Sequence, residues 1–422
     1  MKYLILVPDG AADNIDANGG KTPLEEANMS NINELAKHGE IGMVRTIPNG
    51  VPPGSDAANL AVMGYDPVSD LTGRSPLEAV SMGIELKEKD VAFRTNLVTL
   101  RGSESDKYED MTIIDHSSGD ISDEEAAVLI NYINEKLGSG NLDNNDRVHF
   151  YPGVSYRHAL IISDGDKTDN NIGDVYSDYT SYNLTPPHDV LDKQIGEYFP
   201  SDPKEAYILD FMKKSYDLLK NHEVNLKRKE KGLNPGNSIW IWGEGIRPTF
   251  SPIAQKYGID GSVISAVDLI KGIGICAGLE PIAVKGATGT LSTNFSGKAE
   301  AAISEYKKGK DFVYLHVEAP DECSHQGCRE EKIEAIEKID EKVLGPILEY
   351  FRNCGDDFKI LIVPDHRTPL ETRTHSDDPV PFVMYDSRKD CYNENNEFSE
   401  KAGMTGNNID AGKELANLFF EI

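Results

Sequence analysis

Three short motifs each place an aspartate directly after a proline at the end of an apolar run. The motifs are VPDG at 7–10, APDE at 319–322 and VPDH at 363–366. The runs before them have the near-continuous hydrophobicity of strands that are covered on both faces. In open α/β sheets, ligands bind at the carboxyl ends of the strands. We therefore expect Asp9, Asp321 and Asp365 to meet at one edge of a sheet.

Histidines follow two of these aspartates at spacings that suit metal ligation. His325 lies four residues after Asp321, so the two side chains share a face if a helix begins there. His366 directly follows Asp365, and His375 follows in RTHSDDPVP. A single strand-end aspartate is typical of a turn or helix cap, but clustered carboxylates and imidazoles would repel or stay unsatisfied without cations. The sequence predicts a two-metal site whose oxygen and nitrogen ligands suit Mn²⁺, Zn²⁺ or Mg²⁺.

A serine in NGVPPGSDAANLAVMGYDP, residues 49–67, is the candidate nucleophile. Ser55 follows a Pro-Pro-Gly turn and precedes a helical run over 56–63. A helix N-terminus favours phosphate, and a metal ion on the serine oxygen would make that oxygen a better nucleophile toward phosphorus. The alternative is that Ser55 is a plain helix N-cap.

Other polar residues around the second motif, in LHVEAPDECSHQG at 315–327, are expected to play lesser parts. His316 lies inside the apolar run and is expected to be structural. Glu318 precedes the proline and is expected to support the ligands, while Glu322 is expected to face solvent.

The elements that must position these residues alternate between apolar runs and amphipathic stretches, which indicates an α/β fold with a mostly parallel central sheet flanked by helices. The clearest strands are expected at 3–7, 312–317 and 359–363, and the clearest helices at 30–38, 124–137, 204–220, 298–307 and 329–351. The middle of the chain is richer in Asp, Asn, Ser and Tyr. This shift predicts a core of 1–84 plus 246–422, interrupted by a smaller inserted α/β or α+β domain, 85–245.

The charge balance argues against polyanionic partners. The 422 residues carry 71 acidic and 43 basic side chains, a net charge of -28 that repels nucleic acid and anionic membrane surfaces. The apolar run before Pro8 is too short for a signal peptide or membrane span, which needs about 20 apolar residues. Five scattered cysteines do not form a disulfide framework, so we expect a reducing cytoplasm.

Together, these motifs resemble the alkaline phosphatase superfamily and, within it, the archaeal-type cofactor-independent phosphoglycerate mutases. The motifs that carry the resemblance are VPDG, PPGSDAANLAVMGYDP, HVEAPDECSHQG and PDHRTPLETRTHSDDPVPF, with GRSPLEAVSMGIEL, DVAFRTNLVT and KGATGTLSTNFSGKAEAA. They cover both ends of the chain and the start of its middle. The resemblance implies an alkaline-phosphatase-like core and a mutase that converts 3-phosphoglycerate into 2-phosphoglycerate in glycolysis.

Carried over to these positions, the resemblance implies two sites for divalent metal ions, with Mn²⁺ ahead of Zn²⁺ or Mg²⁺, and no bisphosphoglycerate. One ion would be held by Asp321, His325 and His375. The other would be held by Asp9, Ser55, Asp365 and His366. Ser55 would carry a phosphoserine intermediate while glycerate reorients, and the inserted domain would bind the small phosphorylated anion and exclude water.

Substrate contacts are expected from arginines, because carboxylate and phosphate groups match the guanidinium fork. The candidates are Arg74, Arg94, Asp115, Arg157, Lys271 and Arg373, each of which could instead form a surface or structural ion pair. Asp115 is followed by His116 and two serines, which departs from the family pattern. The residues that bind glycerate therefore stay unassigned.

Three functions therefore stay open from the sequence alone. The first is the mutase. The second is a related enzyme that transfers phosphate to homoserine or hydrolyses phosphomonoesters, since it would share the metal and serine motifs. The third is a metal-dependent binding protein without catalysis. The oligomeric state has no signal in the sequence.

Overall fold

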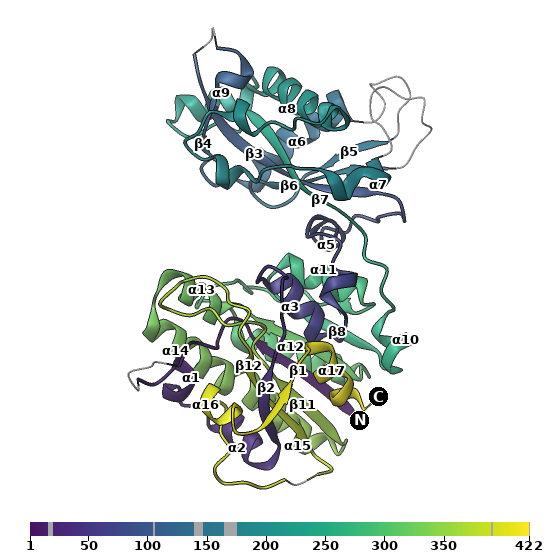
Figure 1. The fold of residues 1–422 in the computed structure, drawn as a ribbon, viewed down its shortest axis with the longest axis vertical. Helices are drawn as coiled ribbons and strands as arrows, with labels where there is room; N and C mark the ends of the chain where they lie inside the picture. Colours follow the sequence, from purple (N-terminus) through teal and green to yellow (C-terminus); the bar gives the residue numbers. More distant parts are fainter. Residues whose placement is uncertain (16–19, 104–105, 139–146, 164–174, 390, 422) are drawn as a thin grey trace. The chain divides into compact units, whose positions relative to one another are not determined.

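The chain divides into two compact units, which are described separately. A computed structural model describes residues 1–15, 20–103, 106–138, 147–163, 175–389 and 391–421. The first unit comprises Met1–Leu71 and Thr249–Ile422, and the second comprises Thr72–Pro248 (Figure 1). Every described helix is too short or too polar to cross a membrane.

The first unit is built on an eight-stranded sheet with the order β13-β2-β12-β11-β1-β10-β8-β9. Its strands are β1 (Lys2–Pro8), β2 (Glu40–Val44), β8 (Gly261–Ile264), β9 (Glu280–Pro281), β10 (Phe312–Val317), β11 (Phe358–Ile362), β12 (Val380–Asp386) and β13 (Asn407–Ile409). Only β12 runs antiparallel to its neighbours among the described pairs. β1 lies between β10 and β11 and is parallel to both, so the three strands that precede the Pro-Asp motifs are adjacent.

Helices cover both faces of this sheet (Figure 1). They are α1 (Pro23–Glu26), α2 (Ser30–His38), α3 (Ser55–Val62), α4 (Pro67–Asp70), α10 (Ile253–Tyr257), α11 (Asp268–Cys276), α12 (Phe295–Lys307), α13 (Ala319–Gln326), α14 (Arg329–Lys338), α15 (Gly345–Cys354), α16 (Glu400–Gly403) and α17 (Gly412–Phe420). Leu4 and Leu6 of β1 share a buried apolar cluster with residues of α2, α12 and α15. Tyr3 points to the opposite face, because side chains alternate along a strand, and contacts Phe419 of α17.

One predicted helix, 329–351, is interrupted. A π-helical turn, η6 (Ile339–Leu344), separates α14 from α15. Asp340 lies buried in this turn and accepts hydrogen bonds from the backbone N–H groups of Asn31 and Ile32 at the start of α2. The π-helical turn thus brings a carboxylate to the N-terminus of α2, a contact that the helical pattern over 329–351 does not predict.

The second unit is an α+β structure around an antiparallel sheet. Its strands are β3 (Val91–Arg101), β4 (Thr112–Asp115), β5 (Val148–Tyr151), β6 (Arg157–Ile162) and β7 (Ser238–Ile246). The long strand β3 pairs with β4, β6 and β7. Helices α5 (Ser75–Ser81), α6 (Asp123–Leu137), α7 (Val175–Asp178), α8 (Ala206–Leu219) and α9 (Glu223–Glu230) accompany it, with short 3₁₀ turns η1 (Tyr108–Asp110), η2 (Tyr179–Ser181), η3 (Pro187–Val190), η4 (Ile195–Tyr198) and η5 (Pro203–Glu205).

The compact second unit begins earlier than the inserted domain proposed from composition. Its bounds are 72 and 248, whereas the change in composition lies near 85 and 245. The difference arises because α5 packs against β3 and β7 of the second unit. The composition of this seven-residue helix does not show which unit it joins, because its contacts with β3 and β7 decide that.

Candidate metal centre and nucleophile

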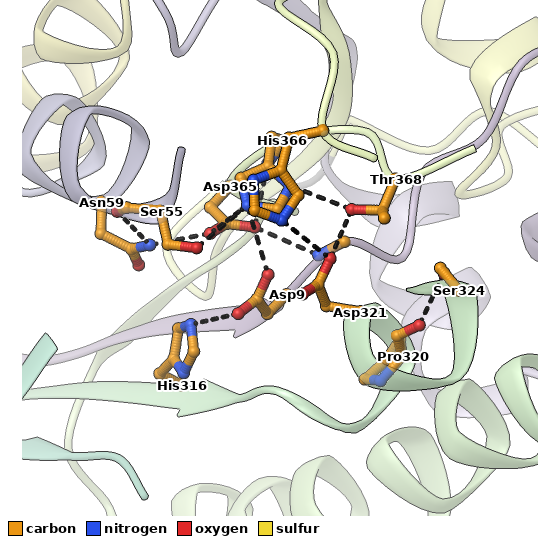
Figure 2. Close-up of polar contacts among 12 residues, drawn as sticks. Asp9, Ser55, Asn59, His316, Pro320, Asp321, Ser324, Asp365, His366 and Thr368 are labelled. Atoms are coloured by element: carbon orange, nitrogen blue, oxygen red, sulfur yellow. Dashed lines mark hydrogen bonds and ion pairs between the residues drawn. The ribbon is translucent and has the colours of Figure 1, made fainter. Parts of the chain in front are cut away.

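The adjacent strands β11, β1 and β10 bring three aspartates to one edge of the sheet. Asp9 follows β1 directly, and Asp365 lies three residues beyond β11. Asp321 does not end a strand, because β10 stops at Val317 and Asp321 lies in the first turn of α13. All three carboxylates are at least nine-tenths buried, and they lie together with Ser55 and His366 (Figure 2).

The first group of ligand atoms surrounds Asp321. His325 lies on the same face of α13, with its Nε2 atom 3.0 Å from Asp321 Oδ2. His375 Nε2 lies 3.5 Å from Asp321 Oδ1 and 3.1 Å from His325 Nε2. Asp321, His366 and His375 also form a group whose ligand atoms are within 4.8 Å of one another. Imidazole nitrogens that converge on one carboxylate suit a divalent cation with nitrogen and oxygen ligands.

The second group is fully enclosed and consists of Asp9, Asp365 and His316, whose ligand atoms lie within 4.8 Å of one another. Asp9 Oδ1 is buried without a hydrogen-bond partner among the described residues. Burial raises the pKa of Asp9 well above its ordinary value, and the nearby carboxylates of Asp365 and Asp321 raise it further. A buried carboxylate with a free oxygen and like-charged neighbours needs a compensating cation, so these residues fit a metal ion.

Ser55 lies beside these ligands. Its Oγ atom is 3.1 Å from His366 Nε2, which in turn lies 3.3 Å from Asp365 Oδ2 and 3.6 Å from Asp9 Oδ1. Ser55 is the first residue of α3, and Gly54 holds the N-cap position, where no side chain caps the helix. The hydroxyl is therefore free of the capping role that the sequence left open, and it points into the cluster of ligands.

Two residues that the sequence did not single out hold this arrangement. Asn59, one turn after Ser55 on α3, donates from Nδ2 to Ser55 O and to Asp365 Oδ2, both at 2.8 Å. Tyr314 of β10 donates from its hydroxyl to Asn59 Oδ1 at 2.6 Å. The sequence does contain a signal for Asn59, which is the one polar residue of the apolar run AANLAV. A polar side chain in a buried helix needs hydrogen-bond partners.

His316, which the sequence suggested to be structural, lies at the ligand cluster. Its Nε2 atom is 3.0 Å from Asp9 Oδ2, and its Nδ1 atom is 3.3 Å from Ser265 Oγ. Burial lowers the pKa of His316 to about 4, so the ring is neutral at neutral pH. Lys298, a fully buried cation on α12, donates to His316 O at 2.9 Å, and burial lowers its pKa to about 8. Sequence reasoning did not single out this lysine.

The two glutamates of the same motif differ in burial. Glu318 is a largely buried side chain, and burial raises its pKa to about 7, with Asp321 and Glu322 adding to the effect. Glu322 lies on the outer side of α13, where Oε1 accepts a hydrogen bond from Gln326 Nε2 at 2.7 Å. Glu318 thus adds a carboxylate that senses the charge of Asp321, while the hydrogen bond of Glu322 stays within its own helix.

Three of the candidate substrate residues already have partners of their own. Arg94 forms a two-pronged ion pair with Glu78 and lies over the Trp242 ring. Asp115 accepts hydrogen bonds from the backbone N–H groups of Ser117 and Gly119 and so fixes its own loop. Lys271 pairs with Asp268 at 2.7 Å, one turn earlier on α11.

The other three candidates differ in their settings. Arg373 contributes a backbone carbonyl, which accepts a hydrogen bond from His325 Nδ1 at 2.9 Å and so orients the imidazole of this candidate ligand. Arg74 flanks the N-terminus of α5 and is exposed. Arg157 is an exposed residue at the start of β6, and its guanidinium lies over the Tyr156 ring at 5.5 Å.

A pocket of about 270 Å³ within the second unit is lined by two of these arginines, Arg94 and Arg157. It is lined by Glu78, Arg94, Asn96, His116, Tyr156, Arg157, His158, His188 and Trp242. Since Arg94 neutralises the single carboxylate of the lining, Arg157 and the imidazoles of His116 and His188 leave the pocket suited to an anion.

Comparison with known proteins identifies the family of this chain. A model of the 2,3-bisphosphoglycerate-independent phosphoglycerate mutase family matches residues 36–225. A protein of that name from Methanosarcina barkeri is 46% identical over 407 residues, which are 96% of this chain and 96% of the relative. The chain belongs to the 2,3-bisphosphoglycerate-independent phosphoglycerate mutase family. A relative from Geobacter sulfurreducens, named as a probable mutase of the same kind, is 44% identical and covers 96% of this chain and 94% of its own.

Solved structures agree with the architecture of this phosphoglycerate mutase family member. A protein from Pyrococcus horikoshii has 27% sequence identity and a TM-score of 0.78, covering 100% of this chain and 96% of its own. The cofactor-independent phosphoglycerate mutase from Thermoplasma acidophilum has a TM-score of 0.64 at 24% identity, covering 100% and 99%, and supports the fold. The resemblance inferred from the Pro-Asp motifs is therefore confirmed, as is the mostly parallel α/β core.

Proposed function

We propose that this protein interconverts 3-phosphoglycerate and 2-phosphoglycerate through a phosphoserine intermediate on Ser55. The observation that carries the proposal is the position of Ser55 Oγ, in the first turn of α3 and 3.1 Å from His366 Nε2, beside three buried aspartates. The mutase family to which the chain belongs supports the same reaction. Backbone N–H groups in the first turn of a helix favour a phosphate at this point.

Two divalent metal ions complete the site in this proposal. Asp321, His325 and His375 would hold one ion, and the other would be held by Asp9, Ser55, Asp365 and His366. Mn²⁺ is the ion we propose first, because the ligands are carboxylates, imidazoles and a hydroxyl without thiolate. When bound, such ions neutralise phosphate oxygens and lower the pKa of the serine hydroxyl.

The side chains then carry out two in-line transfers. Ser55 Oγ forms a bond to phosphorus as the bond from phosphorus to the 3-oxygen of the substrate breaks, and the proton given up by Ser55 ends on that oxygen. Glycerate reorients while it is retained. Its 2-hydroxyl next attacks the phosphoserine, and the proton of this hydroxyl restores Ser55. The buried carboxylates of Asp9 and Asp365 keep the ligand geometry constant through both steps.

An isomerisation assay tests this function. Purified protein with Mn²⁺ should convert 3-phosphoglycerate into 2-phosphoglycerate without added bisphosphoglycerate, and EDTA should abolish the conversion until the metal is restored. A matched sample treated with EDTA that is presaturated with Mn²⁺ controls for the chelator itself. Phosphorylation of homoserine or hydrolysis of phosphomonoesters in the absence of isomerisation would contradict the mutase and support the related transferase or phosphatase.

We further propose that the second unit retains glycerate through Arg157 in its anion-binding pocket. Changing Arg157 to methionine should raise KM for 3-phosphoglycerate by about 10- to 100-fold, since a charge-assisted hydrogen bond contributes about 1.5–3 kcal/mol. Arg101→Met is the matched control, because Arg101 is the exposed last residue of β3 and lines a different pocket. Steady-state kinetics of both variants give the measurement. Equal KM values for the two variants would remove Arg157 from the substrate site.

A further inference from the structure

Thr368 lies between the two groups of ligands, although neither its residue type nor its spacing marks it as a ligand. Its side chain is fully buried. Thr368 Oγ1 donates a hydrogen bond to Asp321 Oδ1 and lies 3.2 Å from His366 Nδ1 (Figure 2). One hydroxyl therefore contacts a ligand of the first proposed ion and a ligand of the second.

The direction of the two hydrogen bonds follows from the protons available. Thr368 Oγ1 is the donor toward Asp321 Oδ1, because a carboxylate that holds a cation carries no proton and can only accept. The single hydroxyl proton of Thr368 must go to Asp321, which leaves its oxygen to accept from His366 Nδ1–H. This hydrogen bond fixes the tautomer of His366 and leaves the Nε2 lone pair facing Ser55 Oγ and Asp9 Oδ1.

The backbone of Thr368 is held by the loop that follows β1. Thr368 N donates to Ala12 O at 3.2 Å, and Thr368 O accepts from Lys332 Nζ at 3.0 Å. Lys332 is a fully buried cation on α14 that also pairs with Asp13 Oδ2 at 3.0 Å. A Cβ atom at Gly10 would lie 2.6 Å from Thr368 Oγ1 and 2.5 Å from Asp321 Oδ1, so the backbone of the loop packs against both oxygens and leaves no room for a side chain there.

We infer that Thr368 is a positioning residue that couples the two metal sites. The inference rests on the two-metal centre of the proposed function. When the Asp321 site is filled, the carboxylate is fixed, the Thr368 hydroxyl is fixed with it, and His366 is held with Nε2 toward the other site. By linkage, filling the other site has the same effect in reverse. The Thr368 hydroxyl bonds to His366 and Asp321, so its effect acts through these two residues.

Two variants separate the hydroxyl from the shape of the side chain. Thr368→Val keeps the branched shape and removes the hydroxyl, while Thr368→Ser keeps the hydroxyl. Calorimetric titration of metal-stripped protein with Mn²⁺, without substrate, measures both binding constants. We expect Thr368→Val to weaken Mn²⁺ binding by about 10- to 100-fold, as for other partners of metal-bound histidines. Thr368→Ser should bind within about threefold of the wild type.

A double-mutant cycle with His325→Ala tests the coupling itself. This change removes a ligand of one site, and its effect on Mn²⁺ affinity at the remaining site should differ between the wild-type and Thr368→Val backgrounds by about fivefold or more. Equal effects in the two backgrounds would overturn the coupling. Unchanged binding constants in Thr368→Val, or equal losses in the valine and serine variants, would overturn the role of the hydroxyl. Thermal unfolding of each metal-free variant confirms that it is folded, and failure of the mutase assay would leave these binding constants unaffected.

Discussion

Replacement of Ser55 by alanine should abolish isomerisation, with kcat lowered by about 10⁴-fold or more. The change removes the oxygen that lies 3.1 Å from His366 Nε2 and that we propose accepts the phosphoryl group. The fold should be unaffected, because the Ser55 side chain does not cap α3 and Asn59 bonds to the backbone oxygen of Ser55. The loss should therefore appear in kcat, while the thermal midpoint of unfolding stays close to that of the wild type.

The measurement combines turnover with detection of the covalent intermediate. Wild-type protein mixed with 3-phosphoglycerate and quenched with acid should yield a phosphorylated peptide that contains Ser55, and Ser55→Ala should yield none. Ser296→Ala is the matched control, since Ser296 also lies in the first turn of a helix of the first unit, α12, and is exposed. Turnover that survives in Ser55→Ala, or phosphate found on another residue, would assign the nucleophile elsewhere.

The parts of the site that the sequence predicts are those carried by short local motifs. Three apolar runs with Pro-Asp after them are adjacent parallel strands in the sheet, as their hydrophobicity suggested. The spacing of Asp321 and His325 is a helical spacing, and α13 realises it. Predicting such features requires only the local hydrophobic periodicity of the chain and the rule that ligands bind at the carboxyl ends of strands.

The supporting residues could not be predicted in this way, because their burial depends on distant elements. Lys332 lies among glutamates in REEKIEAIEK, where a lysine normally faces solvent, yet the loops after β1 and β11 enclose it completely. Thr368 is an ordinary loop threonine until Asp321, 47 positions earlier in the chain, meets its hydroxyl. The same limit applies to the break in the helix at 339–344, where Asp340 serves the start of α2.

Asp9→Asn should change stability and metal binding in opposite directions. In the metal-free protein, the buried Asp9 carboxylate faces Asp365 and Asp321, and its raised pKa reports the free-energy cost of keeping it ionised. An amide removes this charge with almost no change in shape. The metal-free variant should therefore unfold at a higher temperature than the metal-free wild type, by roughly 2–4 °C for each kcal/mol gained. It should also lose the Mn²⁺-dependent rise in unfolding temperature, because an amide is a weaker ligand than a carboxylate.

Asp13→Asn provides the contrast that isolates the cause, because Asp13 is a buried carboxylate of the same loop that has a cationic partner in Lys332. Removing its charge leaves the buried lysine unpaired, so this variant should unfold at a lower temperature with or without metal. Thermal unfolding of the three proteins, with EDTA and with saturating Mn²⁺, gives all the required comparisons. A metal-free Asp9→Asn protein that is less stable than the wild type would mean that Asp9 stabilises the fold without a cation. Opposite signs at two aspartates four residues apart would instead show that the buried Asp9 carboxyl lowers the stability of the metal-free protein, as a site built to bind a cation requires.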